Sequence, residues 1–226
     1  MSTTMGRPGA ATIQIAVTAY RDELAEGVRN VLTEAFFDDP MMTYMLPDAD
    51  HRRRVLPRYF ASVLRVARGR GVIRAAVDDG EVQGAIIGMP PGTYPLPLLP
   101  QLREVRTIVA AGLRATLTNF FDVPVIDAVR PKAPYWYVMF LGTSPAHQRS
   151  GIGALMLQEV FERAEADALP VYLSTMKERN VAYYQRFGFE LRNQLTMGKR
   201  GPATWTMLRP AMSGGSGLES PEDLTL

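Results

Sequence analysis

The sequence contains no cysteine in its 226 residues. This absence excludes disulfide bonds, thiolate metal sites and a cysteinyl acyl-enzyme intermediate. The chain also lacks the run of about 20 apolar residues that a membrane-spanning helix requires, and its N-terminus lacks the hydrophobic core of a signal peptide. We therefore expect a cytoplasmic protein that has no membrane partner and no bound metal.

An excess of charge of either sign is missing as well. The chain has 25 Lys and Arg against 23 Asp and Glu, a formal net charge of +2, and this balance argues against a nucleic-acid-binding protein. The length and a hydrophobic content of 46% predict a single α/β domain with a substantial core. We place this domain at residues 12–210. Both ends are small, polar and glycine-bearing, so residues 1–11 and 211–226 are predicted to be flexible tails.

The strongest local signal lies between Tyr135 and Ala168. Residues 135–141 have the length and the aromatic and β-branched content of a buried strand, and Gly-Thr-Ser-Pro stops this strand at 142–145. A polar, glycine-containing turn follows and leads into a helix. One face of this predicted helix is apolar, with Ile152, Leu155, Met156, Val160 and Ala164.

The turn before this helix, Gln148 to Ala154, has the properties of an anion-binding site. The first N–H groups of a helix have no partner inside the helix, and the helix macrodipole adds roughly half a positive charge there. Gly151 and Gly153 carry no β-carbon that would keep a ligand away from the backbone. The turn is therefore predicted to bind a diphosphate on main-chain amides.

Two common phosphate-binding motifs do not fit this turn. A P-loop places Lys followed by Ser or Thr after its last glycine, whereas Ala154 and Leu155 stand there. A dinucleotide-binding fingerprint has a third glycine where this sequence has Met156, and no acidic residue ends a second strand nearby.

Two signatures resemble the GNAT superfamily of N-acetyltransferases. The first is Gln-x-x-Gly-x-Gly, in which Gln148, Gly151 and Gly153 match the pyrophosphate loop of that superfamily. The second follows a predicted short strand at 171–175: Asn180, then tyrosine, then Gly-Phe at 188–189, where the glycine ends a predicted helix. More narrowly, residues 35–40 and the order of features from 130 to 205 resemble the puromycin-type acetyltransferases, whereas residues 90–130 match no family.

This resemblance implies a fold, a cosubstrate and a set of contacts. The implied fold is α/β: a single GNAT-like domain whose mixed, mostly antiparallel central sheet is flanked by helices and splayed at the cofactor cleft. The implied cosubstrate is acetyl-CoA, with backbone groups of Leu141 and Thr143 on its pantetheine arm, amides of residues 149–154 on its pyrophosphate, and Asn180 on the arm. The implied cofactor-binding residues are Leu141, Gly142, Thr143, Gln148, Arg149, Ser150, Gly151, Ile152, Gly153, Ala154, Asn180 and Tyr184.

The resemblance also assigns a catalytic acid but no base. Tyr184 matches the superfamily tyrosine that protonates the departing thiolate, and an unperturbed tyrosine pKa near 10 suits a thiol leaving group. Tyr137 stands where relatives often carry a glutamate, so no carboxylate is well placed by sequence. Neutralising a lysine amine at pH 7 costs roughly 4–5 kcal/mol, against about 1 kcal/mol for an α-amine. Without a strong base, a small molecule with a low-pKa primary amine is the expected acceptor.

Two other functions remain open from the sequence. The acceptor can instead be a protein N-terminus or lysine, or the chain can be a non-catalytic module that binds acyl-CoA. A homodimer is compatible with the sequence, because the predicted C-terminal strand at 204–209 can pair between subunits.

The rest of the chain yields further predicted elements. Strands are expected at 13–17, 72–77 and 82–88, with an Asp-Gly turn joining the last two, and helices at 21–37, 51–68 and 101–121. Asp38-Asp39-Pro40 is predicted to end the first helix. The apolar residues that follow it, from Met41 to Leu46, are predicted either to line the acceptor site or to fill the core.

Overall fold

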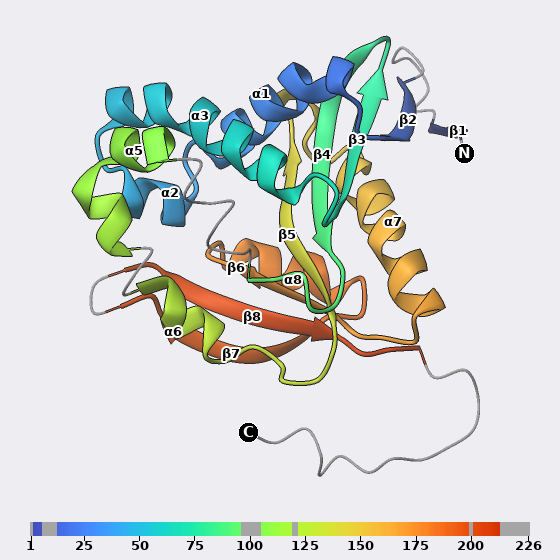
Figure 1. Ribbon diagram of the computed structural model, residues 1–226. Helices are drawn as coiled ribbons and strands as arrows, with labels where there is room; N and C mark the ends of the chain where they lie inside the picture. The colour runs from blue at the N-terminus through green and yellow to red at the C-terminus, as the bar shows by residue number, and fades with distance from the viewer. Residues whose placement is uncertain (1, 6–12, 96–104, 119–121, 199–200, 213–226) are drawn as a thin grey trace.

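One eight-stranded sheet organises the chain (Figure 1). The computed structural model describes residues 2–5, 13–95, 105–118, 122–198 and 201–212. The strand order is β1-β2-β3-β4-β5-β6-β8-β7, and β5–β6 is the parallel pair among antiparallel neighbours. This confirms the predicted mixed, mostly antiparallel sheet. The strands are β1 (Ser2–Met5), β2 (Ile13–Ala19), β3 (Val72–Asp78), β4 (Glu81–Met89), β5 (Trp136–Thr143), β6 (Val171–Thr175), β7 (Glu190–Thr196) and β8 (Ala203–Arg209).

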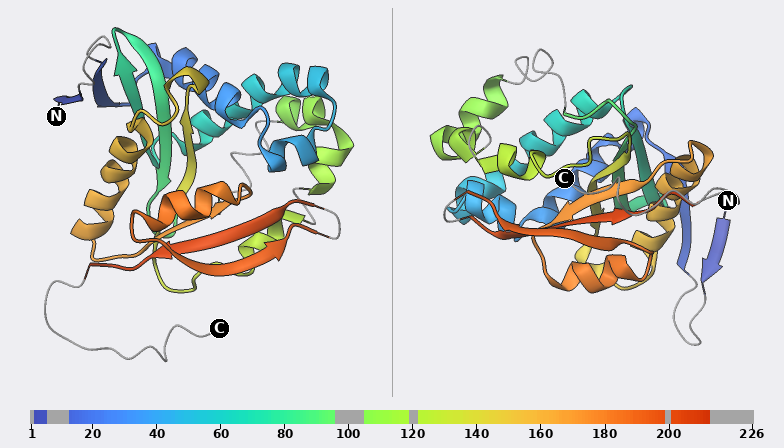
Figure 2. Two further views of the ribbon diagram at one scale, coloured as in Figure 1. Left: turned by 180° about the vertical axis from the view of Figure 1, so that it is seen from behind. Right: turned by 90° about the horizontal axis from the view of Figure 1, so that it is seen from below.

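Helices cover both faces of this sheet. Figure 1 shows α1 and α3 on one side of β3, β4 and β5, and α7 on the other, and the view from behind in Figure 2 shows the same arrangement. Among the described helices, none combines the length and apolar character needed to cross a membrane. The helical segments are η1 (Asp22–Leu24), α1 (Ala25–Phe36), α2 (Pro40–Met45), α3 (Ala49–Ala67), α5 (Val105–Leu117), α6 (Val123–Asp127), η3 (Pro145–His147), α7 (Ile152–Ala166) and α8 (Arg179–Gln185).

The side chains of the central strands point alternately to the two faces of the sheet and contribute to two separate hydrophobic cores. Successive side chains of a strand point to opposite faces of a sheet. On β5, Tyr137 therefore packs under α1 and α3, whereas its neighbours Trp136 and Val138 pack under α7 and α8. Phe60 of α3 is fully buried in the first core, with ring contacts to Phe36 and Phe140 at centroid distances of 5.6 and 5.3 Å. Both faces of β5 are thus buried, which explains why the sequence of this strand is apolar without interruption.

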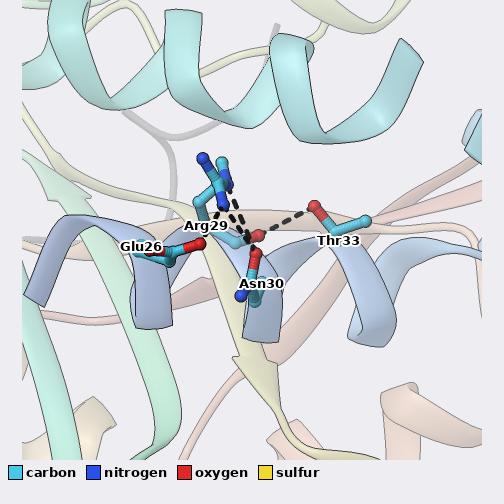
Figure 3. Close-up of polar contacts among 4 residues, drawn as sticks. All are labelled: Glu26, Arg29, Asn30 and Thr33. Atoms are coloured by element: carbon cyan, nitrogen blue, oxygen red, sulfur yellow. Dashed lines mark hydrogen bonds and ion pairs between the residues drawn. The ribbon is translucent and has the colours of Figure 1, made fainter. Parts of the chain in front are cut away.

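The outer face of α1 carries a small polar network, drawn in Figure 3. Arg29 Nη2 donates to Glu26 Oε1 at 3.0 Å and to Asn30 Oδ1 at 3.1 Å, and Thr33 Oγ1 donates to the carbonyl oxygen of Arg29 at 2.8 Å. Exposed pairs at this spacing contribute only about 0.2–0.5 kcal/mol each. We infer that burial of the opposite face, where Leu32 is fully enclosed, holds α1 in place.

Several predicted boundaries need correction. Residues 1–11 were expected to be a tail, but Ser2–Met5 forms β1 and pairs with β2. The predicted helix at 21–37 is divided into η1 and α1, and α5 is interrupted at Gly112, whose φ is 85°. Parts of the predicted helix at 101–121, and the tail from 213 onward, lie outside the described residues. Helices α2 and α6 and strand β7 had not been predicted: the residues from Met41 to Leu46 were expected to form an apolar, flexible stretch, but Pro40–Met45 is helical.

The C-terminal strand lies inside the sheet. β8 pairs with β6 on one side and with β7 on the other. It therefore presents no free edge to which a strand of a second subunit could be added, whereas an exchange of this strand between subunits is not tested by the fold. Whether the protein forms a homodimer in another way stays a prediction.

The start of α3 offers a test of local stability. Asp48 caps this helix, because its Oδ1 accepts from the backbone N–H of His51 at 2.6 Å. Asp48→Ala leaves this N–H unpaired and is expected to lower the free energy of unfolding by about 1 kcal/mol, measured by urea denaturation. Asp48→Asn keeps a capping oxygen and is expected to retain most of the stability. Equal losses in the two variants would show that the cap is not the cause.

Candidate active site

Strands β5 and β6 diverge at the centre of the sheet. They pair over three residues, from Trp136↔Val171 to Val138↔Leu173, and then separate, although β5 continues to Thr143. Within the described chain, the β5 backbone beyond Val138 is therefore paired with β4 alone. In Figure 1 the strands β6, β8 and β7 are steeply inclined to β3, β4 and β5, so the sheet opens at this point.

A β-bulge sharpens the divergence. The register between β4 and β5 shifts so that Ile87 faces Phe140 while Gly88 faces Val138, which leaves Met139 as the extra residue. Bulges bend a strand and re-aim its side chains. As a result, Met139 and Phe140 both pack toward the core under α1 and α3, and the free backbone edge of Leu141 turns toward the opening.

The turn from Gln148 to Ala154 presents unpaired backbone donors. Arg149 and Gly151 have left-handed conformations, with φ of 67° and 90°, and Gly151 is the N-cap of α7 without a side-chain cap. Among the described residues, the N–H groups of Arg149, Gly151, Ile152 and Gly153 have no hydrogen-bond partner, whereas that of Ala154 donates to the carbonyl of Gly151 at 3.0 Å. Consecutive free amides of this kind form an anion-binding concavity.

The two glycines of this turn serve different needs. Gly151 adopts a φ that β-carbon-bearing residues rarely tolerate. At Gly153 the limit is space, because an added β-carbon would lie 2.7 Å from the hydroxyl of Tyr183. The side chains of Gln148 and Arg149 are exposed, and Ser150 Oγ donates to the carbonyl of His147 at 2.6 Å. The backbone of this turn is thus its main binding surface.

Helix α8 brings two further predicted residues to the opening. Asn180 Nδ2 donates to Thr175 Oγ1 at 3.0 Å, which ties the helix to the end of β6. Tyr184 is 9% exposed and packs against Tyr183 and Phe189 at ring-centroid distances of 5.2 and 5.6 Å. Burial raises the pKa of Tyr184, and the negative forms of Tyr183 and Asp39 raise it further. The phenol therefore stays protonated well above neutral pH.

A cavity of about 200 Å³ occupies the gap between the strands. Of the predicted site residues, Leu141, Asn180 and Tyr184 line this cavity, whereas residues 148–154 lie outside it, at the N-terminus of α7. Gly142 is buried against α1 and contributes backbone alone. The other lining residues come from six parts of the chain: Ala35, Phe36, Asp39, Met41, Met42, Tyr59, Tyr94, Val123, Ile126, Asp127, Arg130, Tyr137, Val138, Met139, Phe140, Leu173, Ser174, Thr175, Met176 and Lys177.

Asp39 is a lining residue that the sequence analysis did not single out. Its side chain caps α2, because Oδ1 accepts from the backbone N–H of Met41 at 3.0 Å, and its Oδ2 lies 3.6 Å from Nζ of Lys177. The residue is 8% exposed. Burial raises the pKa of the Asp39 carboxyl, and the nearby Lys177 opposes this shift. The sequence does contain one indication of this role: Asp followed by Pro is typical of the start of a helix, with Asp39 as the cap and Pro40 as the first helical residue.

A second charged pair, Asp127 and Arg130, also lines the cavity. Arg130 lies between the rings of Tyr94 and Tyr137, with its guanidinium carbon 3.9 and 4.5 Å from their centroids. Its Nη2 pairs with Asp127 Oδ1 at 2.8 Å. Both Asp127 and Arg130 belong to α6 or follow it directly, so this part of the unassigned segment 90–130 forms a wall of the cavity. Among the described residues, no group of three or more His, Cys, Asp or Glu is placed to hold a metal ion.

Comparisons with known proteins agree with this geometry. The profile of the acetyltransferase (GNAT) family matches residues 28–189. An uncharacterized N-acetyltransferase of Schizosaccharomyces pombe is 23% identical over 177 residues, which cover 70% of this chain and 67% of the yeast protein.

Solved structures share the fold. A structure described as histone acetyltransferase HPA2 and related acetyltransferase, from Corynebacterium glutamicum, is 22% identical with a TM-score of 0.69 and covers 89% of this chain and 99% of its own. The ribosomal-protein-S18-alanine N-acetyltransferase of Escherichia coli is 11% identical with a TM-score of 0.53 and covers 91% of this chain and 99% of its own. At these identities the likeness concerns the fold alone.

Proposed function

The chain belongs to the GNAT family of acetyltransferases, which use acetyl-CoA, and from this premise we propose that it acetylates the primary amine of a small molecule. The amine attacks the thioester carbonyl directly, without an acyl-enzyme intermediate. The observation that carries this proposal is the separation of β5 from β6 after Val138 and Leu173, which opens a cavity beside Tyr184.

The cofactor would lie along this opening. The free amides of Arg149, Gly151, Ile152 and Gly153 are suited to its pyrophosphate, because the macrodipole of α7 and the left-handed turn both favour an anion there. The unpaired edge of β5 at Leu141 and Thr143 would bond the pantetheine amides in place of a neighbouring strand, as added strands do in peptide recognition. Asn180 lies at the end of β6, on the opposite side of the same gap.

Tyr184 would serve as the acid for the departing thiolate. Its pKa is raised by burial, which at first weakens it as a proton donor. The same burial also disfavours a thiolate beside it, because both charged forms are anions that lose hydration. Burial therefore raises the pKa values of the phenol and of the thiol together, and the transfer of the proton from Tyr184 to the sulfur remains feasible inside the cavity.

The size and the mixed apolar and polar walls of the cavity favour a small acceptor. Methionine and aromatic side chains from α1, α2 and α3 form one side, and α6 with Tyr94 closes the other. Sites for small molecules are clefts or cavities in which apolar and aromatic walls are combined with a few placed polar groups, and this cavity has both kinds of lining residue. The order of features at 35–40 and 130–205 supports the finer proposal of a puromycin-type enzyme.

Turnover with a panel of acceptors tests this proposal. Release of free thiol from acetyl-CoA is measured with arylalkylamines, diamines and amino-acid amides, and with peptides bearing a free α-amine or a lysine. We expect saturable binding of acetyl-CoA by calorimetry and the highest kcat/KM for a small amine. Faster acetylation of a peptide would establish a protein acetyltransferase, and binding without turnover on any amine would establish a non-catalytic acyl-CoA module.

A further inference from the structure

A buried carboxylate, that of Asp39, lines the cavity. Asp39 sits between α1 and α2, is 8% exposed and lines the same cavity as Tyr184. Its immediate neighbour in sequence, Asp38, has a side chain that is 86% exposed and pairs with Arg52 at 3.7 Å. The two adjacent aspartates thus have opposite environments: Asp39 is buried and lines the cavity, whereas Asp38 is exposed to solvent.

The contacts of Asp39 leave room for another hydrogen-bond partner. A carboxylate offers about four lone-pair positions. The backbone N–H of Met41 occupies one of them on Oδ1, and the backbone N–H of Met42 also interacts with the carboxylate. The 3.6 Å between Oδ2 and Lys177 Nζ exceeds a direct hydrogen bond. A donor that enters the cavity can therefore bond to Asp39 without displacing the helix cap.

Three titratable side chains from other elements face Asp39 in the described structure. Lys177, after β6, is the cation among them, and its charge lowers the pKa of Asp39. Tyr59 of α3 and Tyr184 of α8 are the other two, and the charge of Asp39 adds to the rise of both their pKa values, behind burial. Asp39 is thus electrostatically coupled to the residue proposed as the acid.

We propose that Asp39 is the catalytic base, and that the acceptor enters the cavity as a primary alkylammonium ion whose nitrogen bonds to this carboxylate. This inference rests on the proposed acetyl transfer and deepens it. It also revises the expectation from sequence that no base is present. An acceptor of high basicity is now accommodated, because the enzyme itself supplies the group that removes its proton.

The ammonium nitrogen of the acceptor loses two protons in one turnover. Asp39 takes one proton from the ammonium nitrogen, and the neutral amine attacks the thioester carbon to form the C–N bond. The C–S bond then breaks, Tyr184 delivers its proton to the sulfur of CoA, and the phenolate of Tyr184 takes up the second proton that the nitrogen loses. One of the two protons from nitrogen thus replaces the one that Tyr184 gives, and the other leaves from Asp39 to solvent.

Asp39→Asn tests the proposal, since asparagine keeps the oxygen that caps α2 but cannot accept a proton. With the best small amine from the panel, we expect kcat/KM at pH 7 to fall about a hundredfold, the lower end for loss of a general base. The deficit should shrink as the pH rises toward the pKa of the amine, because the acceptor then arrives already neutral. A purely structural defect would lower the rate by the same factor at every pH.

Two further variants sharpen the result. Lys177→Met removes the cation that lowers the pKa of Asp39, so the acid limb of the kcat/KM profile should move to higher pH. Asp38→Asn changes the exposed neighbour and should leave the profile unchanged. A pH-independent loss, or no loss, in Asp39→Asn would overturn the assignment while leaving acetyl transfer intact, whereas the absence of turnover in the unaltered protein would refute the proposed function itself.

Discussion

Tyr184→Phe is expected to lower kcat by roughly a hundredfold to ten-thousandfold, the range for loss of a general acid, with little change in acetyl-CoA affinity. The phenyl ring of the variant keeps the packing against Tyr183 and Phe189. The hydroxyl that is proposed to protonate the departing sulfur is lost, so the thiolate would leave unprotonated in a poorly hydrated cavity. Initial rates of thiol release under saturating substrates give the kcat, and calorimetry gives the affinity.

Tyr183 provides the matched control for this variant. It precedes Tyr184 on α8, but its hydroxyl approaches Gly153 rather than the cavity. Tyr183→Phe should therefore keep kcat within a few-fold. If Tyr184→Phe turns over as fast as the unaltered protein, the acid is another group or water, and the assignment drawn from the family signature is wrong.

Gly151→Val is expected to weaken acetyl-CoA binding about a hundredfold, which corresponds to roughly 3 kcal/mol, or the loss of about two hydrogen bonds to a charged group. Gly151 has φ of 90° at the N-cap of α7. A β-branched residue is a severe outlier in this conformation. The turn must rearrange, and the free amides of Arg149, Gly151, Ile152 and Gly153 would then no longer converge on one anion.

Gly80→Val separates this effect from general destabilisation. Gly80 has φ of 81°, lies in the turn between β3 and β4, and has open space around an added β-carbon. The backbone strain is thus similar, but it lies in a hairpin turn away from α7. Calorimetry should show unchanged acetyl-CoA affinity in Gly80→Val. Equal weakening in both variants would mean that the loss comes from unfolding and not from the turn.

The cofactor side of the site was predictable because its signals are local. Strand, turn and helix follow each other within about thirty residues, and the pattern of apolar residues and glycines fixes each of them. The predicted strand at 171–175 coincides with β6. Tyr184 was identified by its distance from Gly188, whose φ of 81° ends the helical segment as predicted. The roles of these residues in binding and catalysis stay predictions.

The acceptor side was not predictable, because its contacts join segments far apart in the chain. Asp39 was interpreted as part of a helix terminator, and its own segment contains nothing that marks it as buried. Its environment is created by Lys177 and Tyr184, which lie about 140 residues later and reach it only through the order of strands in the sheet. The hydrophobic periodicity of a short segment predicts local structure, but it cannot predict a contact between residues so far apart in the chain.

Two missed elements illustrate the limits of patterning. Helix α6 is five residues long and contains a proline near its start, so it has too few turns for a helical period to be visible. Strand β7 is mostly exposed along its length and lies at the end of the sheet, paired with β8 alone. Its alternation of apolar and polar residues is weak because neither of its faces is fully covered.

The position of β8 has a consequence for the order in which the protein matures on the ribosome. β6, one wall of the opening, holds β5 through three residue pairs and depends on β8 for its other neighbour. Residues 203–209 emerge late in translation, after all other strands. A nascent chain can assemble β2 to β5 with α1, α3 and α7 beforehand, but the opening between β5 and β6 gains its second wall only when this last strand has been released and inserted.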